Sequence, residues 1–162
     1  METAILFAQL VTTTALAGWL TTGVRDNLLY PSLNETYTAE VLEITRMREE
    51  YPEAYEKVAH RAISDRRLQL WAFRLVVAAE LTATVLLWIG TLALLLALPG
   101  AIDAEVARTW AVIGVVAFVC VWSSFLIVGN HFCYWFGHEG AQNTHFQLTI
   151  WGVGTLILLA QG

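Results

Sequence analysis

The stretch Leu68–Leu98, LQLWAFRLVVAAELTATVLLWIGTLALLLAL, decides the fold class of this chain. It is 31 residues long and holds only two ionisable side chains, Arg74 and Glu80. At roughly 1.5 Å of rise per residue, such a helix is longer than the ~30 Å hydrocarbon core of a bilayer. Pro99 and Gly100 follow directly and predict its end. The sequence therefore predicts a membrane-spanning helix whose first turns extend beyond the hydrocarbon.

Three further apolar stretches predict three more spans, at residues 3–24, 106–136 and 142–160. Short connections make the last three of the four spans antiparallel neighbours. The chain is 57% hydrophobic and only 14% charged, which leaves too few polar residues to cover a soluble core. We expect an all-α, single integral membrane domain over residues 1–162, folded as a four-transmembrane-helix antiparallel bundle.

Residues 25–67 form a long polar loop between the first two predicted spans. Ser32 to Glu35 has the pattern of a capping box, which predicts a helix over residues 36–50. Pro52 suits the first turn of a second short helix. Two alternatives stay open for the apolar stripes of these helices. They contact the membrane surface or a partner, or they pack on the bundle of this chain itself.

The distribution of Lys and Arg predicts the orientation of the chain. Seven of the nine lie in the 25–67 loop, and only Arg108 lies near the opposite face. The excess of positive charge in cytoplasmic loops then puts this loop in the cytoplasm and both termini outside. The net charge of −5 offers no basic surface for nucleic acid.

Glu80 is the most informative position, because a carboxylate within an apolar helix costs about 2.5–3.5 kcal/mol on insertion. Three interpretations stay open: a buried structural hydrogen bond, a proton or ligand role, and an interfacial position. Arg74 lies six residues away on a different face of the helix, so it is not an easy partner for Glu80. Gln9 is a further polar residue within the first predicted span.

A second cluster of polar residues lies where the third and fourth predicted spans meet. Its members are Asn130, His131, His138, Glu139, Gln142, Asn143 and His145. These side chains either satisfy the backbone of a turn, bind a partner, or hold a metal or haem. A metal site would use His131, Cys133 and His138, but this spacing matches no standard ligand signature, so we predict no metal residues.

Three short motifs in the chain resemble those of a known family. They are Asp26-Asn27, Ala72-Phe73-Arg74 before Ala78-Ala79-Glu80, and Trp135 before Glu139-Gly140-Ala141-Gln142. The family is that of the bacterial small integral membrane proteins known as domain of unknown function 2165. The resemblance covers nearly the whole chain, although Gly129-Asn130 replaces an expected Gly-Gly pair and the first loop is unusually charged. It implies a four-helix protein of the bacterial cytoplasmic (inner) membrane and no particular reaction.

Two functional hypotheses follow. The first is a non-catalytic accessory or structural subunit of a larger membrane complex, for example an energy-transducing, respiratory or photosynthetic one, in contact with lipids and other integral membrane subunits. The second is a small membrane protein that binds haem, quinone or a metal through Glu80 and the Asn130–His145 corner. An enzyme has the least support, because nucleophile-elbow, phosphate-loop and zinc-protease motifs are all missing. The sequence requires no cofactor.

Overall fold

The computed structural model describes residues 2–162, most of which are helical. Its long helices are α1 (Glu2–Leu29), α5 (Arg66–Ala97), α6 (Ala104–His131) and α7 (Glu139–Leu159). The connection between α1 and α5 holds α2 (Pro31–Leu42), α3 (Thr45–Glu50), α4 (Pro52–Glu56) and the 3-10 turn η1 (Ala59–Arg61). Residues 2–162 contain no strand, so the predicted all-α class is confirmed.

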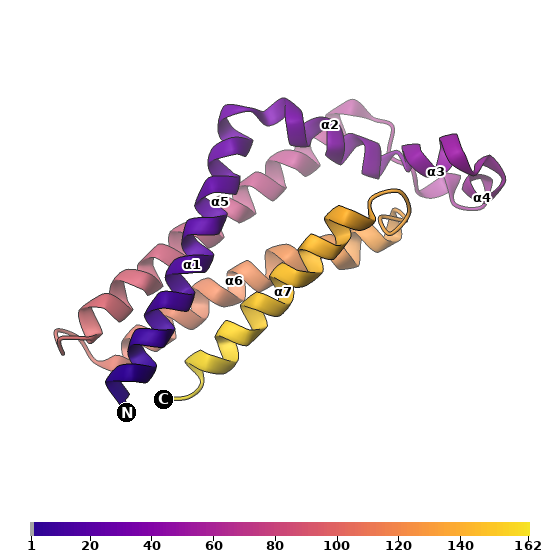
Figure 1. The fold of residues 1–162 in the computed structure, drawn as a ribbon. Coiled ribbons are helices and arrows are strands. Elements are labelled where there is room, and N and C mark those ends of the chain that lie inside the picture. Colours follow the sequence, from indigo (N-terminus) through magenta and orange to yellow (C-terminus); the bar gives the residue numbers. More distant parts are fainter. Residues whose placement is uncertain (1) are drawn as a thin grey trace.

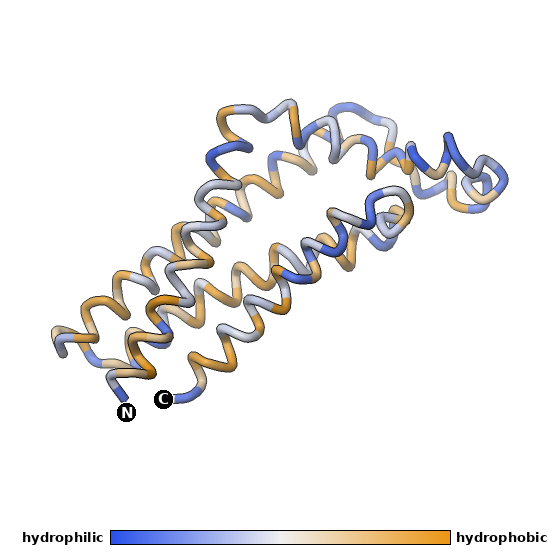
Figure 2. Tube along the Cα trace, in the orientation of Figure 1, coloured by the Kyte–Doolittle hydropathy of each residue, from blue (hydrophilic) through white to orange (hydrophobic). Residues whose placement is uncertain are grey.

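Three of the long helices, α1, α5 and α6, are long and apolar enough to cross a bilayer. The first two turns of α7 are polar and contain Gln142, Asn143 and His145. Figure 2 shows hydrophilic residues gathered in these turns and in α2 to α4, whereas the rest of the long helices is mainly hydrophobic. Three candidate spans are therefore present, and the fourth span, at residues 142–160, stays a prediction.

The helices α5 and α6 form the most closely packed pair. They are joined by a tight turn in which Gly100 has a φ of 78°, and Asp103 then caps α6 by accepting the N–H groups of Glu105 and Val106. A Cβ atom at Gly90 would lie 2.5 Å from the Cα atom of Ala111, so only glycine allows this approach. Helix α1 packs on α5, and α7 packs on α6. Both termini lie at the end of the molecule where the turn joins α5 to α6 (Figure 1).

The apolar side chains of the long helices divide into a core and an outer surface. Leu16, Leu87 and Phe118 are among those completely buried between the helices. The outward faces expose many others, such as Leu75 and Ile127, both more than 70% exposed. Burying apolar surface stabilises by about 25 cal/mol per Å², so this outer surface requires a lipid solvent.

Two predicted ends of spans are wrong. Helix α1 does not end at Val24 but continues through Arg25 to Leu29, since no helix breaker comes before Pro31. Helix α6 ends at His131 rather than at residue 136, because the chain turns there and Cys133 adopts a left-handed conformation with φ of 54°. Asp65 caps α5 by accepting the backbone N–H groups of Arg67 and Leu68.

The predicted loop helices also need correction. Pro31 occupies the first turn of α2, so Ser32 to Glu35 lie inside the helix and form no capping box. The predicted helix over residues 36–50 is broken at Ile44, whose φ of 54° redirects the chain into α3. Pro52 does begin a short helix, α4.

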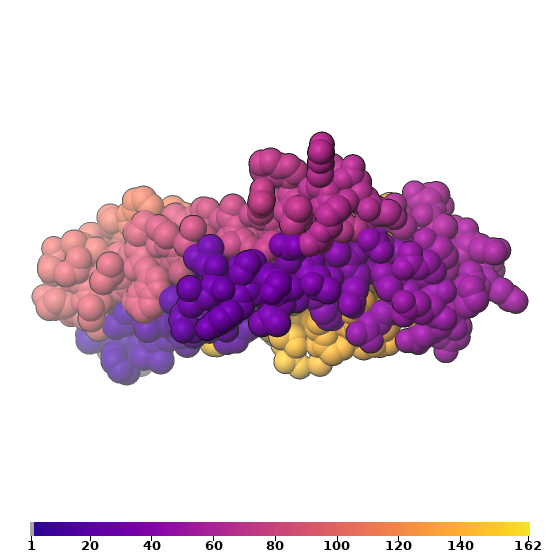
Figure 3. Space-filling view, turned by 90° about the horizontal axis from the view of Figure 1, so that it is seen from above, coloured from indigo at the N-terminus to yellow at the C-terminus, as the bar shows by residue number. Residues whose placement is uncertain are grey.

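The loop packs on the bundle through a small apolar cluster of its own. Leu42, Ile44 and Met47 lie against Phe132 and Cys133 in the turn between α6 and α7. Seen from above, α2 to α4 form most of the near surface at that end of the molecule (Figure 3). Of the two alternatives for the apolar stripes, packing on the bundle itself is confirmed.

Candidate functional site

Glu80 is buried and hydrogen-bonded to the end of α1. The residue is only 5% exposed, and its Oε2 atom accepts the Nδ2–H of Asn27 at 2.7 Å. The Oδ1 atom of Asn27 in turn accepts the Nδ2–H of Asn34 from α2 at 2.6 Å. Since Asn27 directly follows Arg25 and Asp26, the carboxylate lies level with the polar end of α1.

Helix α2 connects this network to the turn between α6 and α7. Tyr37 lies three residues after Asn34, on the same face of α2, and its hydroxyl is 2.9 Å from the Nδ1 atom of His138. The ring of Tyr37 also packs edge-on against the imidazole, with centroids 4.8 Å apart. An ion pair between Glu35 and Arg66 further joins α2 to α5. One face of α2 thus contacts elements from both halves of the chain.

His145 belongs to the same group of polar contacts, which we call the polar layer. Its Nδ1 atom is 3.0 Å from the hydroxyl of Tyr134. Its ring stacks on Phe125, with centroids 4.5 Å apart, and lies 5.2 Å from the ring of Trp122. The ring of Tyr134 also stacks between His145 and His138. The two histidines are therefore held in an aromatic stack that joins α6, α7 and the turn between them.

The electrostatics of the His138–Tyr37 contact favour neutral groups. Burial lowers the pKa of the His138 imidazole below 6.5, and nearby Arg46 lowers this pKa further, while Glu40 and Glu139 oppose the shift. Burial also raises the pKa of the Tyr37 hydroxyl. A neutral imidazole and a neutral hydroxyl can share one hydrogen bond without a buried charge.

Other predicted site residues lie apart from this layer. Arg74 is exposed and stacks over Trp71 rather than facing Glu80. Asn130 and His131 are exposed at the end of α6, and the His131 ring packs on Phe132. Glu139 accepts the backbone N–H of Gly137 at 3.3 Å and so serves the turn itself.

Gln142 and Asn143 lie on the outside of the bundle. With Leu126 and Phe146 they line an open groove of about 270 Å³ between α6 and α7. The groove is separate from the hydrogen bonds that hold His138 and His145. The predicted polar corner is therefore divided into an internal aromatic layer and an external amide surface.

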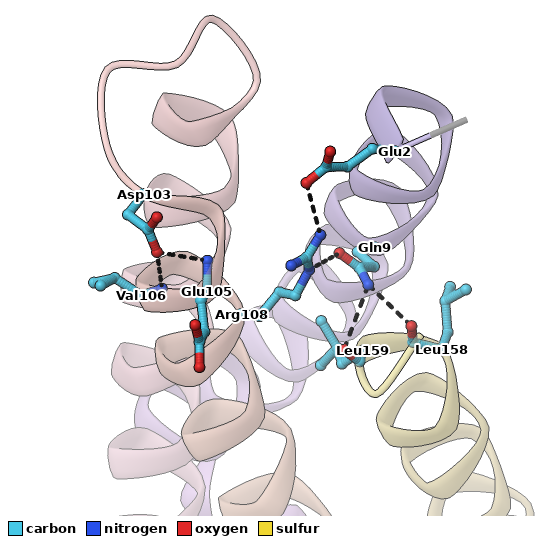
Figure 4. A network of polar contacts seen from close by, with 8 residues as sticks. All are labelled: Glu2, Gln9, Asp103, Glu105, Val106, Arg108, Leu158 and Leu159. Carbon is cyan, nitrogen blue, oxygen red and sulfur yellow. Dashed lines mark hydrogen bonds and ion pairs between the residues drawn. The ribbon is translucent and has the colours of Figure 1, made fainter. Parts of the chain in front are cut away.

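Gln9 belongs to a second polar cluster, at the end of the bundle that carries the termini (Figure 4). It is completely buried, and its Nε2 atom donates to the carbonyl of Leu158 near the end of α7 at 3.0 Å. Its Oε1 atom accepts from Nε of Arg108 at 3.3 Å, and Arg108 lies 3.8 Å from Glu2. This cluster joins α1, α6 and α7.

Metal and haem ligation gain no support from the geometry of the corner. Residues 2–162 bring no three His, Cys, Asp or Glu side chains together in a way that could hold a metal ion. The Nδ1 atoms of His138 and His145 already contact tyrosine hydroxyls, and His131 lies outside the aromatic stack. These contacts resemble structural hydrogen bonds more than an open ligand site.

Four residues that complete these networks were not among the predicted site residues: Asn27, Asn34, Tyr37 and Tyr134. The sequence could have indicated that Asn34 and Tyr37 lie on one face of α2, because residues three positions apart in a helix point the same way. The location of their partners carried no such signal. Asn27 and Glu80 are 53 residues apart in the chain, and Tyr37 and His138 are 101 apart.

The apolar spans and the lipid-facing surface define the class of this chain as a small α-helical integral membrane protein with three candidate spans. Residues 5–162 match the family described as "predicted small integral membrane protein", domain of unknown function 2165. The chain belongs to this family, which confirms the resemblance noted from its motifs. Comparison with curated proteins and with solved structures gives no match.

Proposed function

We propose that this protein is a non-catalytic accessory subunit of a larger membrane assembly. The proposal rests on the hydrogen bonds that the buried polar side chains make within the chain. Glu80, His138 and His145 each bond to a side chain from another part of the chain. Each of these contacts joins two helices or a helix and a turn, which is the behaviour expected of a structural scaffold.

A surface that could meet a partner extends from the loop end. Helices α3 and α4 project beyond the ends of the long helices (Figure 1). Their acidic side chains are exposed, namely those of Glu49, Glu50, Glu53 and Glu56. We call residues 45–56 the acidic arm. A partner that contacts this arm would present basic side chains, because complementary charge steers association.

We infer that α7 forms a fourth span in this assembly. At 21 residues and about 1.5 Å per residue it is long enough to cross the hydrocarbon core. Its polar first turns lie level with the loop end, where α2 and the α6–α7 turn are also polar. With four spans, both termini share one side of the membrane, and the Lys and Arg distribution puts the loop in the cytoplasm.

Purification from native membranes in a mild detergent, followed by mass spectrometry, tests the accessory role. We expect other integral membrane subunits at a fixed stoichiometry. A variant that changes Glu49, Glu50, Glu53 and Glu56 to Gln should lose these subunits, whereas exchange of Glu105, an exposed acid at the opposite end, should not. Migration of the wild-type protein as an isolated monomer or homo-oligomer would contradict the proposal.

A further inference from the structure

The exposed face at the start of α5 combines two arginines with a tryptophan. Arg67, Trp71 and Arg74 recur at the spacing i, i+4 and i+7, so they share one side of the helix. All three are exposed, Trp71 by 66%. The guanidinium carbon of Arg74 lies 5.7 Å from the centroid of the Trp71 ring, within the range of a cation–π contact.

Neither arginine of this face is neutralised by a carboxylate. The ion pairs found among residues 2–162 use other arginines: Arg25, Arg46, Arg48, Arg66 and Arg108. The nearby carboxylate of Asp65 caps the helix by accepting the backbone N–H groups of Arg67 and Leu68. The two guanidinium groups therefore keep their donors available for an external anion.

Further along α5 the same face becomes apolar. The exposed side chains that continue it are Leu75, Val85, Ile89, Leu92 and Leu96. Arg67 and Arg74 are seven residues apart, or about 10 Å along the axis. The face thus has a cationic end near the polar loop and a long apolar part within the span.

We propose that this face binds one anionic phospholipid, with its phosphate between Arg67 and Arg74 and an acyl chain along the apolar part. Guanidinium groups pair with phosphate in a bidentate way, and tryptophan favours the headgroup level of a bilayer. An acidic protein segment would match the arginines but not the apolar residues that follow them. The inference depends on membrane residence and not on the accessory role.

Native mass spectrometry of the purified protein tests this lipid site. The protein is released from micelles that contain equal amounts of phosphatidylglycerol and phosphatidylcholine. We expect wild-type protein to retain phosphatidylglycerol about tenfold over phosphatidylcholine, because each arginine near a membrane surface adds attraction for anionic lipid. Arg67→Gln with Arg74→Gln should remove the preference, and Lys at both positions should keep part of it.

The matched control changes two arginines that already pair with carboxylates, Arg25→Gln with Arg48→Gln, and should keep the full preference. If the R67Q/R74Q protein loses helicity, the single variants R67Q and R74Q are measured instead. In each of them the preference for phosphatidylglycerol should fall about threefold. No preference in wild type, or an unchanged preference in R67Q/R74Q, would overturn the proposal. Displacement of the lipid by excess inorganic phosphate or by an acidic peptide would overturn the assignment to a phospholipid.

Discussion

The two ends of the helical bundle are held together in different ways. At the end with the termini, one buried glutamine, Gln9, contacts the carbonyl of Leu158 and the guanidinium of Arg108, so three long helices meet at a single side chain. At the loop end, Glu80 of α5 bonds directly to Asn27 of α1, and the other polar contacts run through α2. There α2 lies across them, and Asn34 and Tyr37 each contact a different partner.

This difference teaches how the position of a polar group decides its importance. Removal of a side chain that bonds to several helices weakens several contacts at once, whereas the polar contacts of α2 can be lost one at a time. The end with the termini should therefore be the more sensitive to a single substitution. Unfolding by SDS in mixed detergent micelles measures the free energy needed for this comparison.

Gln9→Ala should have the largest effect, a loss of about 3 kcal/mol in the free energy of unfolding. The change removes the side-chain donor from the Leu158 carbonyl, which keeps only the N–H of Gln161, and it removes an acceptor from the largely buried guanidinium of Arg108, which keeps only Glu2. Gln161→Ala is the matched control, since Gln161 is exposed just after α7 and its side chain bonds only to the nearby carbonyl of Ile157. Equal losses in the two variants would remove the proposed difference between the ends.

Glu80→Ala should cost about 2 kcal/mol, because Asn27 is then buried without its acceptor. Glu80→Gln should cost less than about 1 kcal/mol, since an amide oxygen still accepts the Nδ2–H of Asn27. Glu53→Ala, at an exposed position of the acidic arm, serves as the control. A Gln variant as unstable as the Ala variant would show that the charge itself is required.

Tyr37→Phe should cost about 1 kcal/mol, because it removes one hydrogen bond to His138 and keeps the aromatic contact. Tyr30→Phe changes an exposed tyrosine on the same connection and should have almost no effect. If Tyr37→Phe were also neutral, the contact between α2 and the α6–α7 turn would depend on aromatic packing rather than on the hydrogen bond.

The smallest effect should be a pH dependence at the loop end. The pKa of His138 is lowered in the folded protein, so the unfolded chain binds a proton first as the pH falls below 6.5. The stability of the wild-type protein should therefore decrease below pH 6.5 and be fully present above it. His138→Gln should reduce this decrease, and identical pH profiles for the two proteins would contradict the prediction.

Much of the architecture was predictable from local sequence. Apolar runs predicted four spans, three of which are candidate spans in the structure, and Pro52 marked the start of α4 correctly. The errors lie where local signals compete. Polar residues after Val24 suggested an end to α1, yet Arg and Asp are tolerated within a helix, so α1 continues to Leu29.

The sequence by itself determined that this chain must be solvated by lipid, because its apolar runs are too long and its polar residues too few for water. It also pointed to Glu80 and Gln9 as costly polar residues that need partners. Only the tertiary structure decided what those partners are. Asn27 contacts Glu80, and Leu158 contacts Gln9, because the helices that carry them pack together. These contacts join residues 53 and 149 positions apart, and such separations leave no periodic signal in the chain.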